Sequence, residues 1–202
     1  MSAVMEVRPL PGMPEVRELT PPRFADERGF FSELFSQRAW REAGIELDMV
    51  QTNYSLSLHA GTLRGLHFQS PPAAQAKVVA VTRGRIFDVA ADIRKGSPTF
   101  GKWVGVELSA ERGNQLLVPV GFAHGFVTLE PETQVQYAVT SHYSPAHDKG
   151  IRWDDETLAI AWPLDGEPLQ SPRDRGLPRL AEAGTPFKLA AAGDRPAKES
   201  RP

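Results

Sequence analysis

The chain has 202 residues, of which 41% are hydrophobic and 24% charged, and its formal net charge is −2. These values are ordinary for a globular protein of one large domain, and the balanced charge does not favour a protein that binds nucleic acid or a membrane surface. The absence of cysteine excludes disulfides, thiolate nucleophiles and cysteine-based zinc sites. Because the sequence shows neither a membrane-spanning apolar stretch nor the apolar core of a signal peptide, a cytoplasmic protein is expected.

Most of residues 1–165 is expected to form short β-strands, since 18 prolines and 17 glycines are spread along the chain. Alternating or continuous apolar segments predict strands at residues 52–58, 77–82, 85–93, 102–108, 115–119, 125–129 and 134–140. Arg83-Gly84 is a turn signal that predicts a hairpin between the second and third of these strands. Many short strands separated by turns indicate an all-β jelly-roll sandwich or barrel.

Two short helices are expected in addition to the strands. Ser36 is a suitable N-terminal cap for a helix over residues 37–43, and Gly44 stands where a C-terminal glycine belongs. A second helical patch is expected at residues 175–183. Residues 1–188 are expected to form a single domain, and residues 189–202, which lack apolar periodicity, a disordered tail.

Two motifs place histidines after glycine-containing turns. Gly61 is followed by five residues and then His67, and the later motif reads Pro119-x-Gly121-x-x-His124. In this order, the motifs resemble the two halves of a cupin signature. That resemblance implies two facing strands whose histidines point into a barrel.

The same motifs lack residues that a metal-binding cupin usually has. Gln69 stands where such a cupin has a second histidine, and Lys77 stands where it has a glutamate, seven residues before Gly84. An ammonium group has no lone pair to offer a cation, and His67 and His124 alone are fewer than the three protein ligands of a catalytic zinc. The pocket is therefore expected to be free of metal.

A pocket with several cations suits an anionic substrate, such as a nucleoside diphosphate, and a reaction that develops negative charge on oxygen. The expected inward-facing cations and histidines are Arg64, His67, Lys77 and His124. Removing a proton beside a ketone is such a reaction, and histidine is a natural base near neutral pH. Epimerisation also needs an acid on the opposite face of the substrate. Of the three tyrosines, Tyr137 lies within a predicted strand and is the candidate, and Tyr143 ends that strand.

A longer series of motifs resembles the dTDP-4-dehydrorhamnose 3,5-epimerase family over most of the chain. In the order of the family, these motifs are Asp26–Glu33, Gln51–Ser55, Leu63–Gln69, Lys77–Val79, Asp92–Gly101, Pro119–Phe126, Tyr137 with Tyr143, Trp153, and Ile160–Pro163. The resemblance implies a cupin-type jelly roll that forms a homodimer by exchanging N-terminal strands and uses no cofactor. The implied substrate is a dTDP-linked 4-keto-6-deoxyhexose.

The resemblance also implies roles for individual residues. His67 is the expected base, Asp174 its carboxylate partner, Tyr137 the acid and Lys77 the group that stabilises the enolate. The expected substrate-binding residues, some of them reaching in from a second subunit, are Arg28, Glu33, Gln51, Asn53, Arg64, His124, Tyr143 and Arg173. Without the resemblance, Tyr137 is better explained as a core residue and Asp174 as an exposed turn residue.

The sequence departs from the family pattern in places. Asp148 stands where a glutamate is common, Arg173 where a lysine is frequent, and Asp154-Asp155-Glu156 where Asn-Asp-Pro is common. The carbon that is epimerised stays open between carbon 3, carbon 5 and both. Other functions left open are a 3,4-ketoisomerase, a non-catalytic nucleotide-sugar binding module and, least in keeping with Lys77, a metal-dependent cupin oxygenase.

Overall fold

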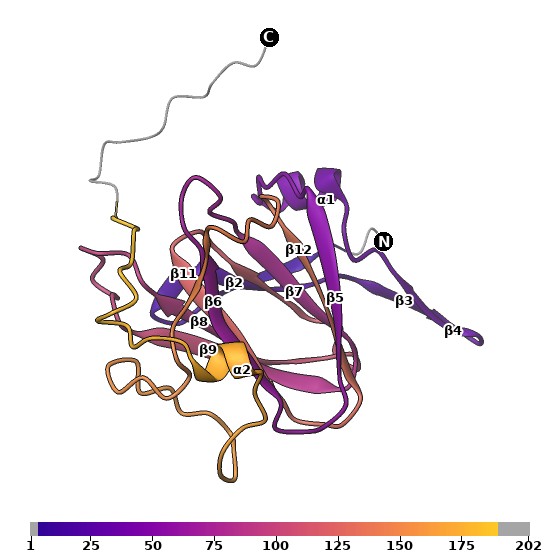
Figure 1. Ribbon diagram of the computed structural model, residues 1–202. Coiled ribbons are helices and arrows are strands. Elements are labelled where there is room, and N and C mark those ends of the chain that lie inside the picture. The colour runs from indigo at the N-terminus through magenta and orange to yellow at the C-terminus, as the bar shows by residue number, and fades with distance from the viewer. Residues whose placement is uncertain (1–3, 190–202) are drawn as a thin grey trace.

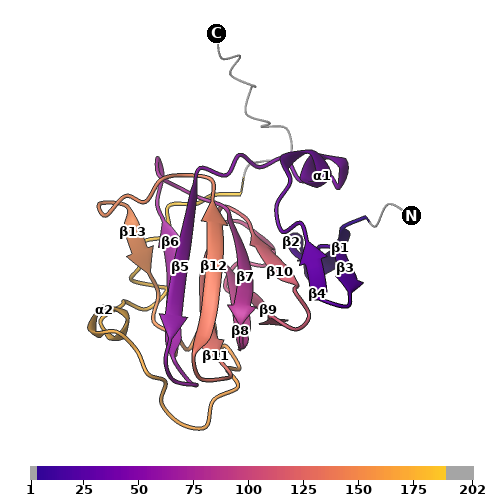
Figure 2. The same cartoon turned by 90° about the vertical axis from the view of Figure 1, so that its right-hand side faces the viewer.

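Two antiparallel sheets face each other in the computed structural model, which describes residues 4–189 (Figures 1 and 2). The six-stranded sheet contains, in spatial order, β1 (Glu6–Leu10), β2 (Met13–Thr20), β10 (Gln115–Val118), β7 (Lys77–Arg83), β12 (Thr133–Val139) and β5 (Gln51–Ser57). The five-stranded sheet contains β13 (Asp148–Gly150), β6 (Leu63–Gln69), β11 (Phe122–Thr128), β8 (Arg85–Asp92) and β9 (Trp103–Ser109). This arrangement confirms the expected all-β jelly-roll class.

The inner faces of the two sheets form the main core. Apolar side chains that alternate along the strands meet between the sheets, as expected for aligned sheet packing. They include Val79 and Val81 of β7, Val135 of β12, Ile86 and Ala90 of β8, and Phe126 of β11. Tyr137 packs against the edge of this core and is only partly buried. The apolar core between the sheets therefore supports the polar side chains of the candidate site.

The chain that follows β13 covers the outer face of the five-stranded sheet. Ile151, Leu158, Leu180 and Phe187 form a second core with Phe68, Val89 and Ala91 from β6 and β8. This segment contains little regular structure, but it is anchored by hydrogen bonds to the sheet, including the reciprocal pair between Leu66 and Ile151. Its packing brings the late part of the sequence back to β6.

The two helices are short. Helix α1 (Gln37–Glu42) begins where expected, and the Ser36 side chain accepts a hydrogen bond from the backbone N–H of Ala39. The prediction of a helix at residues 175–183 is wrong, because α2 spans Pro172–Arg175 and ends at Gly176. Pro178, which lacks a backbone N–H and restricts the residue before it, prevents the helix from continuing.

The predicted strands are present, with shifted ends. The hairpin predicted at Arg83-Gly84 is wrong, because β7 pairs with β10 and β12 in the six-stranded sheet, whereas β8 pairs with β9 and β11 in the other sheet. β11 begins at Phe122, so that His124 lies within a strand and not in the preceding turn. A hairpin of β3 (Arg23–Asp26) and β4 (Gly29–Ser32), not predicted as such, extends away from the sandwich (Figure 1). Within residues 4–189, no helix has the length and apolar character needed to cross a membrane. The predicted disordered tail lies almost wholly outside the described residues, which end at Leu189.

Candidate active site

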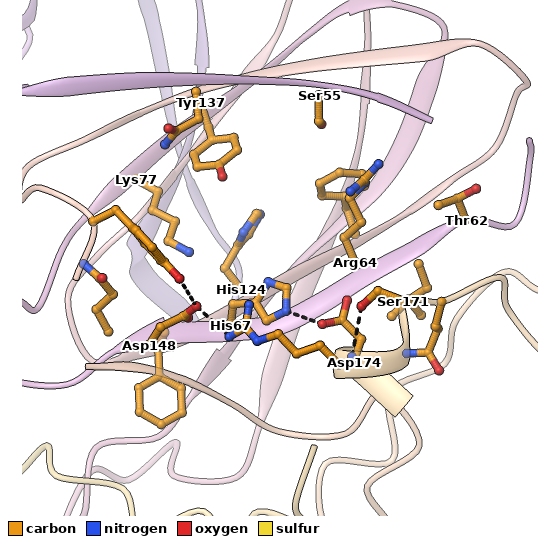
Figure 3. A pocket seen from close by; sticks show the side chains of 18 of the residues that line it. Ser55, Thr62, Arg64, His67, Lys77, His124, Tyr137, Asp148, Ser171 and Asp174 are labelled. Carbon is orange, nitrogen blue, oxygen red and sulfur yellow. Dashed lines mark hydrogen bonds and ion pairs between the residues drawn. The ribbon is translucent and has the colours of Figure 1, made fainter. Parts of the chain in front are cut away.

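A polar cavity of about 510 Å³ opens between the two sheets. Figure 3 shows its side chains converging from both sheets and from α2. Of the residues expected from the sequence, the cavity wall contains Gln51, Asn53, Arg64, His67, Lys77, His124, Tyr137, Tyr143, Arg173 and Asp174. Ten of the twelve predicted site residues thus share one cavity, although they come from segments spread over more than half of the chain.

An irregularity in β6 lets two of these side chains reach the cavity together. Arg64 and His67 are three positions apart and would face opposite sides of a regular strand. The pairing of β6 with β11 shifts between His67 and Arg64, as in a β-bulge, and both side chains line the cavity. Gly65, at a φ of 120°, makes this possible, since a Cβ there would lie 2.7 Å from the Cα of Gly125. This close approach explains the glycines of the Arg-Gly-Leu-His and His-Gly-Phe sequences.

His67 is held by a carboxylate from the far end of the chain. Its Nε2 lies 2.7 Å from Oδ1 of Asp174, and the backbone N–H of Gly65 donates to Oδ2 of the same carboxylate. Burial opposes ionisation of Asp174, but the hydrogen bond and charge of His67 outweigh it and lower the pKa of the carboxyl below its usual range. An ionised Asp174 that accepts from Nε2 leaves Nδ1 of His67 with the free lone pair.

Tyr137 lies on the opposite wall, on β12 of the six-stranded sheet (Figure 3). Burial, with a smaller contribution from the negative charge of Asp148, raises the pKa of its phenol, although Arg64 acts in the opposite direction. The phenol is therefore protonated at neutral pH and can donate a proton. The inward direction expected for Tyr137 is the one observed.

Lys77 begins β7 and is buried, with its amine directed into the cavity (Figure 3). Burial lowers the pKa of the amine from the usual 10.5 to about 8, while Asp148 and, to a lesser extent, Asp88 raise it. The amine is thus mostly charged at neutral pH and can stabilise negative charge that develops on a substrate oxygen.

His124 pairs directly with His67 across β6 and β11, so the two motif histidines lie on adjacent strands of one sheet and not on facing strands as expected. Its Nε2 lies 2.7 Å from Oδ1 of Asp88, a fully buried carboxylate that no sequence motif indicates. Gln69 is used structurally, since its amide donates to the backbone carbonyls of Ala73 and His142. Among residues 4–189, no three His, Asp or Glu side chains are grouped so that they could hold a metal ion.

Polar groups of β5 and β6 line the cavity beside the His67–Asp174 pair. Nε of Arg64 donates to the Ser57 hydroxyl over 3.2 Å, and Nη2 donates to the Leu56 carbonyl over 3.1 Å. The amide of Gln51 donates to Asn53 over 2.7 Å. These bonds fix the side chains while leaving further donors of Arg64 and Asn53 for a ligand.

The wall of the cavity contains a second carboxylate, Asp148, which from the sequence is distinguished only by standing where the family commonly has a glutamate. Oδ2 of Asp148 accepts from the Tyr143 hydroxyl at 2.9 Å and lies 2.7 Å from the guanidinium of Arg173. The hydrogen bond to Asp148 raises the pKa of the Tyr143 phenol. Asp148 therefore binds two exposed residues of the rim, Tyr143 and Arg173, and its negative charge also acts on the buried amine of Lys77.

Two predicted residues lie elsewhere. Arg28 is in the turn between β3 and β4, 85% exposed and paired with Asp26, and Glu33 follows β4 on the surface. Neither residue contributes to the cavity of its own chain. The hairpin also exposes Phe24, Phe30 and Phe31.

A histidine–carboxylate pair and a phenol on opposite walls, with a buried ammonium group in the same cavity, are groups suited to acid–base catalysis on a cupin-like β-sandwich. The sequence profile of the dTDP-4-dehydrorhamnose 3,5-epimerase family matches residues 11–182, and the chain belongs to this family. The curated dTDP-4-dehydrorhamnose 3,5-epimerase of Sinorhizobium fredii is 49% identical over 174 residues, which cover 86% of this chain and 89% of that protein. The enzyme class expected from the sequence, a sugar epimerase, is therefore confirmed.

Solved structures agree with this assignment. The epimerase of Legionella pneumophila, determined in complex with dTDP-4-keto-L-rhamnose, is 42% identical with a TM-score of 0.87, covering 93% of this chain and all of that one (100%). A 3′-monoepimerase of Streptomyces bikiniensis, in complex with dTDP-quinovose, is 37% identical with a TM-score of 0.80, covering 86% of this chain and 87% of that one. The same fold therefore occurs in enzymes named for one epimerised carbon and for two.

Proposed function

We propose that this protein epimerises dTDP-4-keto-6-deoxyglucose at carbons 5 and 3, with His67 as the base and Tyr137 as the acid. The observation that carries the proposal is the position of these two side chains on opposite walls of one cavity, one from each sheet. Inversion at a carbon requires that the proton leaves from one face and returns to the other. A base and an acid on the same wall could not perform it.

The first step is removal of a proton beside the ketone. Nδ1 of His67 takes the proton, the electrons of the C–H bond form a carbon–carbon double bond, and the carbonyl oxygen becomes an enolate. Asp174, which holds Nε2 of His67 at 2.7 Å, stabilises the imidazolium that results. The ammonium group of Lys77 and the guanidinium of Arg64 stabilise the enolate oxygen.

The second step returns a proton to the opposite face. The Tyr137 hydroxyl donates it, the double bond shifts back and the ketone is restored with inverted configuration. The phenolate and the imidazolium then exchange protons with solvent, so the enzyme ends as it began. Tyr143, Arg173 and His124 line the sugar and diphosphate sites, and no cofactor takes part.

Arg28 and Glu33 are proposed to complete the site of a second copy in a homodimer. The hairpin that carries Arg28 extends from the sandwich and exposes three phenylalanines, a surface suited to burial against another subunit. Co-expression of two inactive chains, His67→Asn and Arg28→Ala, tests this arrangement. If the site is shared, the mixed dimer contains one intact site and regains activity. If Arg28 serves its own chain, no activity returns.

The reaction itself is tested by incubating the protein with dTDP-4-keto-6-deoxyglucose in deuterium oxide and following the sugar by NMR. Deuterium is expected at carbons 5 and 3, with inversion at both. Deuterium without inversion and a carbonyl at carbon 3 would instead identify a ketoisomerase. Binding of dTDP with no deuterium incorporation would identify a non-catalytic binding module. Incorporation and inversion at carbon 3 alone would match the Streptomyces bikiniensis monoepimerase.

A further inference from the structure

Gln170 lies on the cavity wall and has no part in the mechanism above. It comes directly before Ser171, which caps α2. The preceding residue, Leu169, makes two backbone hydrogen bonds of 2.9 Å, from N of Leu63 at the start of β6 to Leu169 O and from Leu169 N to O of Gly61 in the turn before β6. The guanidinium of Arg175 donates to the Gln170 carbonyl over 3.1 Å. The backbone therefore holds the Gln170 side chain at a fixed point beside the segment that carries Asp174.

The amide nitrogen of Gln170 stands out among the glutamines of the cavity. The side chain is only 9% exposed, and its Nε2 is buried without a hydrogen bond to any group in residues 4–189. In contrast, the amides of Gln51, Gln69 and Gln75, which line the same cavity, donate to Asn53, to the carbonyls of Ala73 and His142, and to the carbonyl of Ser141, respectively. A buried donor without an acceptor is unfavourable, and most such groups in proteins are satisfied.

We infer that Gln170 is a substrate-binding residue whose amide N–H donates to an oxygen of the bound nucleotide sugar. This inference rests on the proposed function, because it places that substrate in the cavity. The terminal torsion of a glutamine is broad, so a rotation of the amide can turn its donor toward a ligand without moving the backbone. The acceptor is a sugar or diphosphate oxygen, and the ligand supplies the bond that the protein does not.

A binding role and a structural role make opposite predictions for stability and affinity. If the amide served the fold, removing it would break a hydrogen bond and lower the melting temperature. If it serves the ligand, an apolar side chain of similar length relieves an unsatisfied donor in the free protein but weakens binding. Gln170→Met is such a change. Gln170→Glu keeps the shape and replaces the donor with an anionic acceptor, which repels a diphosphate.

The test is calorimetric titration of the wild-type, Gln170→Met and Gln170→Glu proteins with dTDP and with dTDP-glucose, which has no ketone and is not turned over. Gln170→Met is expected to bind dTDP-glucose about 3- to 10-fold more weakly, the usual effect of one lost hydrogen bond, with an unchanged or higher melting temperature. Gln170→Glu is expected to bind more weakly still. Gln134→Met, a matched change of a half-buried glutamine that does not line the cavity, should leave both affinities unchanged.

The two ligands identify the acceptor. An equal loss for dTDP and dTDP-glucose places it on the diphosphate, and a loss for dTDP-glucose alone places it on the sugar. Affinities of both variants within twofold of wild type, or a lowered melting temperature of Gln170→Met with unchanged affinity, would overturn the inference. Deuterium incorporation by the wild-type protein is measured in parallel, so a failure of the proposed epimerase function is recognised separately.

Discussion

Nε2 of His67 and Oδ1 of Asp174 lie 2.7 Å apart, although 107 positions separate the two residues in the sequence. The contact depends on the largely irregular segment that covers the outer face of the five-stranded sheet and contains α2. Although Asp174 is buried, its interactions with His67 lower the pKa of the carboxyl, so it stays ionised and fixes the tautomer of the ring. The base of the proposed reaction is thus oriented by a residue from outside the two sheets.

Removing the carboxylate should therefore impair the base without removing it. Asp174→Asn is expected to lower kcat by about 10²- to 10⁴-fold, since the amide can hold the ring in the wrong tautomer, and His67→Asn should abolish turnover. Steady-state kinetics and deuterium incorporation measure both effects. Near wild-type deuterium incorporation by the His67→Asn protein would show that another group is the base.

Tyr137 can be tested apart from the base, because proton removal and proton return are separate steps. Tyr137→Phe keeps the ring that packs against the core and removes only the hydroxyl. The variant is expected to retain slow exchange of the substrate proton with solvent and to lose inversion by a factor of about 10² or more. NMR in deuterium oxide distinguishes deuterium incorporated with retention from that incorporated with inversion. Normal inversion by this variant would mean that Tyr137 is only a core residue.

Much of the site could be predicted because its strand residues occur in short motifs with fixed spacing. Within Leu63–Gln69 and Pro119–Phe126, the histidines follow from local sequence, and the sheet places them side by side. Periodicity alone gave the wrong environment for Asp174, since a polar, proline-containing segment is usually exposed. Its burial depends on the long-range contact of α2 with β6, where Asp174 meets Gly65 and His67, and no local pattern encodes that contact.

Asp88 and Asp148 could not be predicted from the local sequence either. Asp88 lies in an apolar strand and carries no motif, and only the pairing of β8 with β11 brings it to His124. Asp148 lies on β13, a three-residue edge strand too short to be recognised from alternation. No sequence pattern predicts the hairpin of β3 and β4, because Arg23–Ser32 is exposed along most of its length and has no buried face.

The lowered pKa of Lys77 predicts how activity and stability change with pH. Since the charged amine is needed to stabilise the enolate, kcat/KM should fall as pH rises through about 8. Stability should change in the opposite direction. The folded pKa lies below the usual 10.5, so between about pH 8 and pH 10.5 the unfolded chain binds more protons than the folded protein, and the free energy of unfolding rises with pH.

The size of this effect is about 3 kcal/mol across that window, the equivalent of the change in pKa. Denaturant unfolding at a series of pH values measures it, with Lys77→Met as the control. That variant should be inactive, more stable than wild type at pH 7 and free of the rise in stability between pH 8 and pH 10.5. A rise of equal size in Lys77→Met would assign the effect to another group.

Asp148 affects both the rim of the cavity and the titration of the Lys77 amine. Its negative charge is the largest influence that raises the pKa of Lys77, and its carboxylate also holds Tyr143 and Arg173. Asp148→Asn is therefore expected to move the alkaline limb of kcat/KM to lower pH and to raise KM severalfold, because the two rim residues lose their anchor. Asp148→Glu, which keeps the charge, should leave the limb near its wild-type position.

Tyr143→Phe separates the two effects of Asp148. It removes the hydroxyl that donates to Asp148 but leaves the carboxylate and its charge beside Lys77. KM should therefore rise while the alkaline limb stays in place. If the limb moves as far in Tyr143→Phe as in Asp148→Asn, the pH dependence follows closure of the rim and not the charge next to the amine. An unmoved limb in Asp148→Asn would show that Lys77 does not set the alkaline decline.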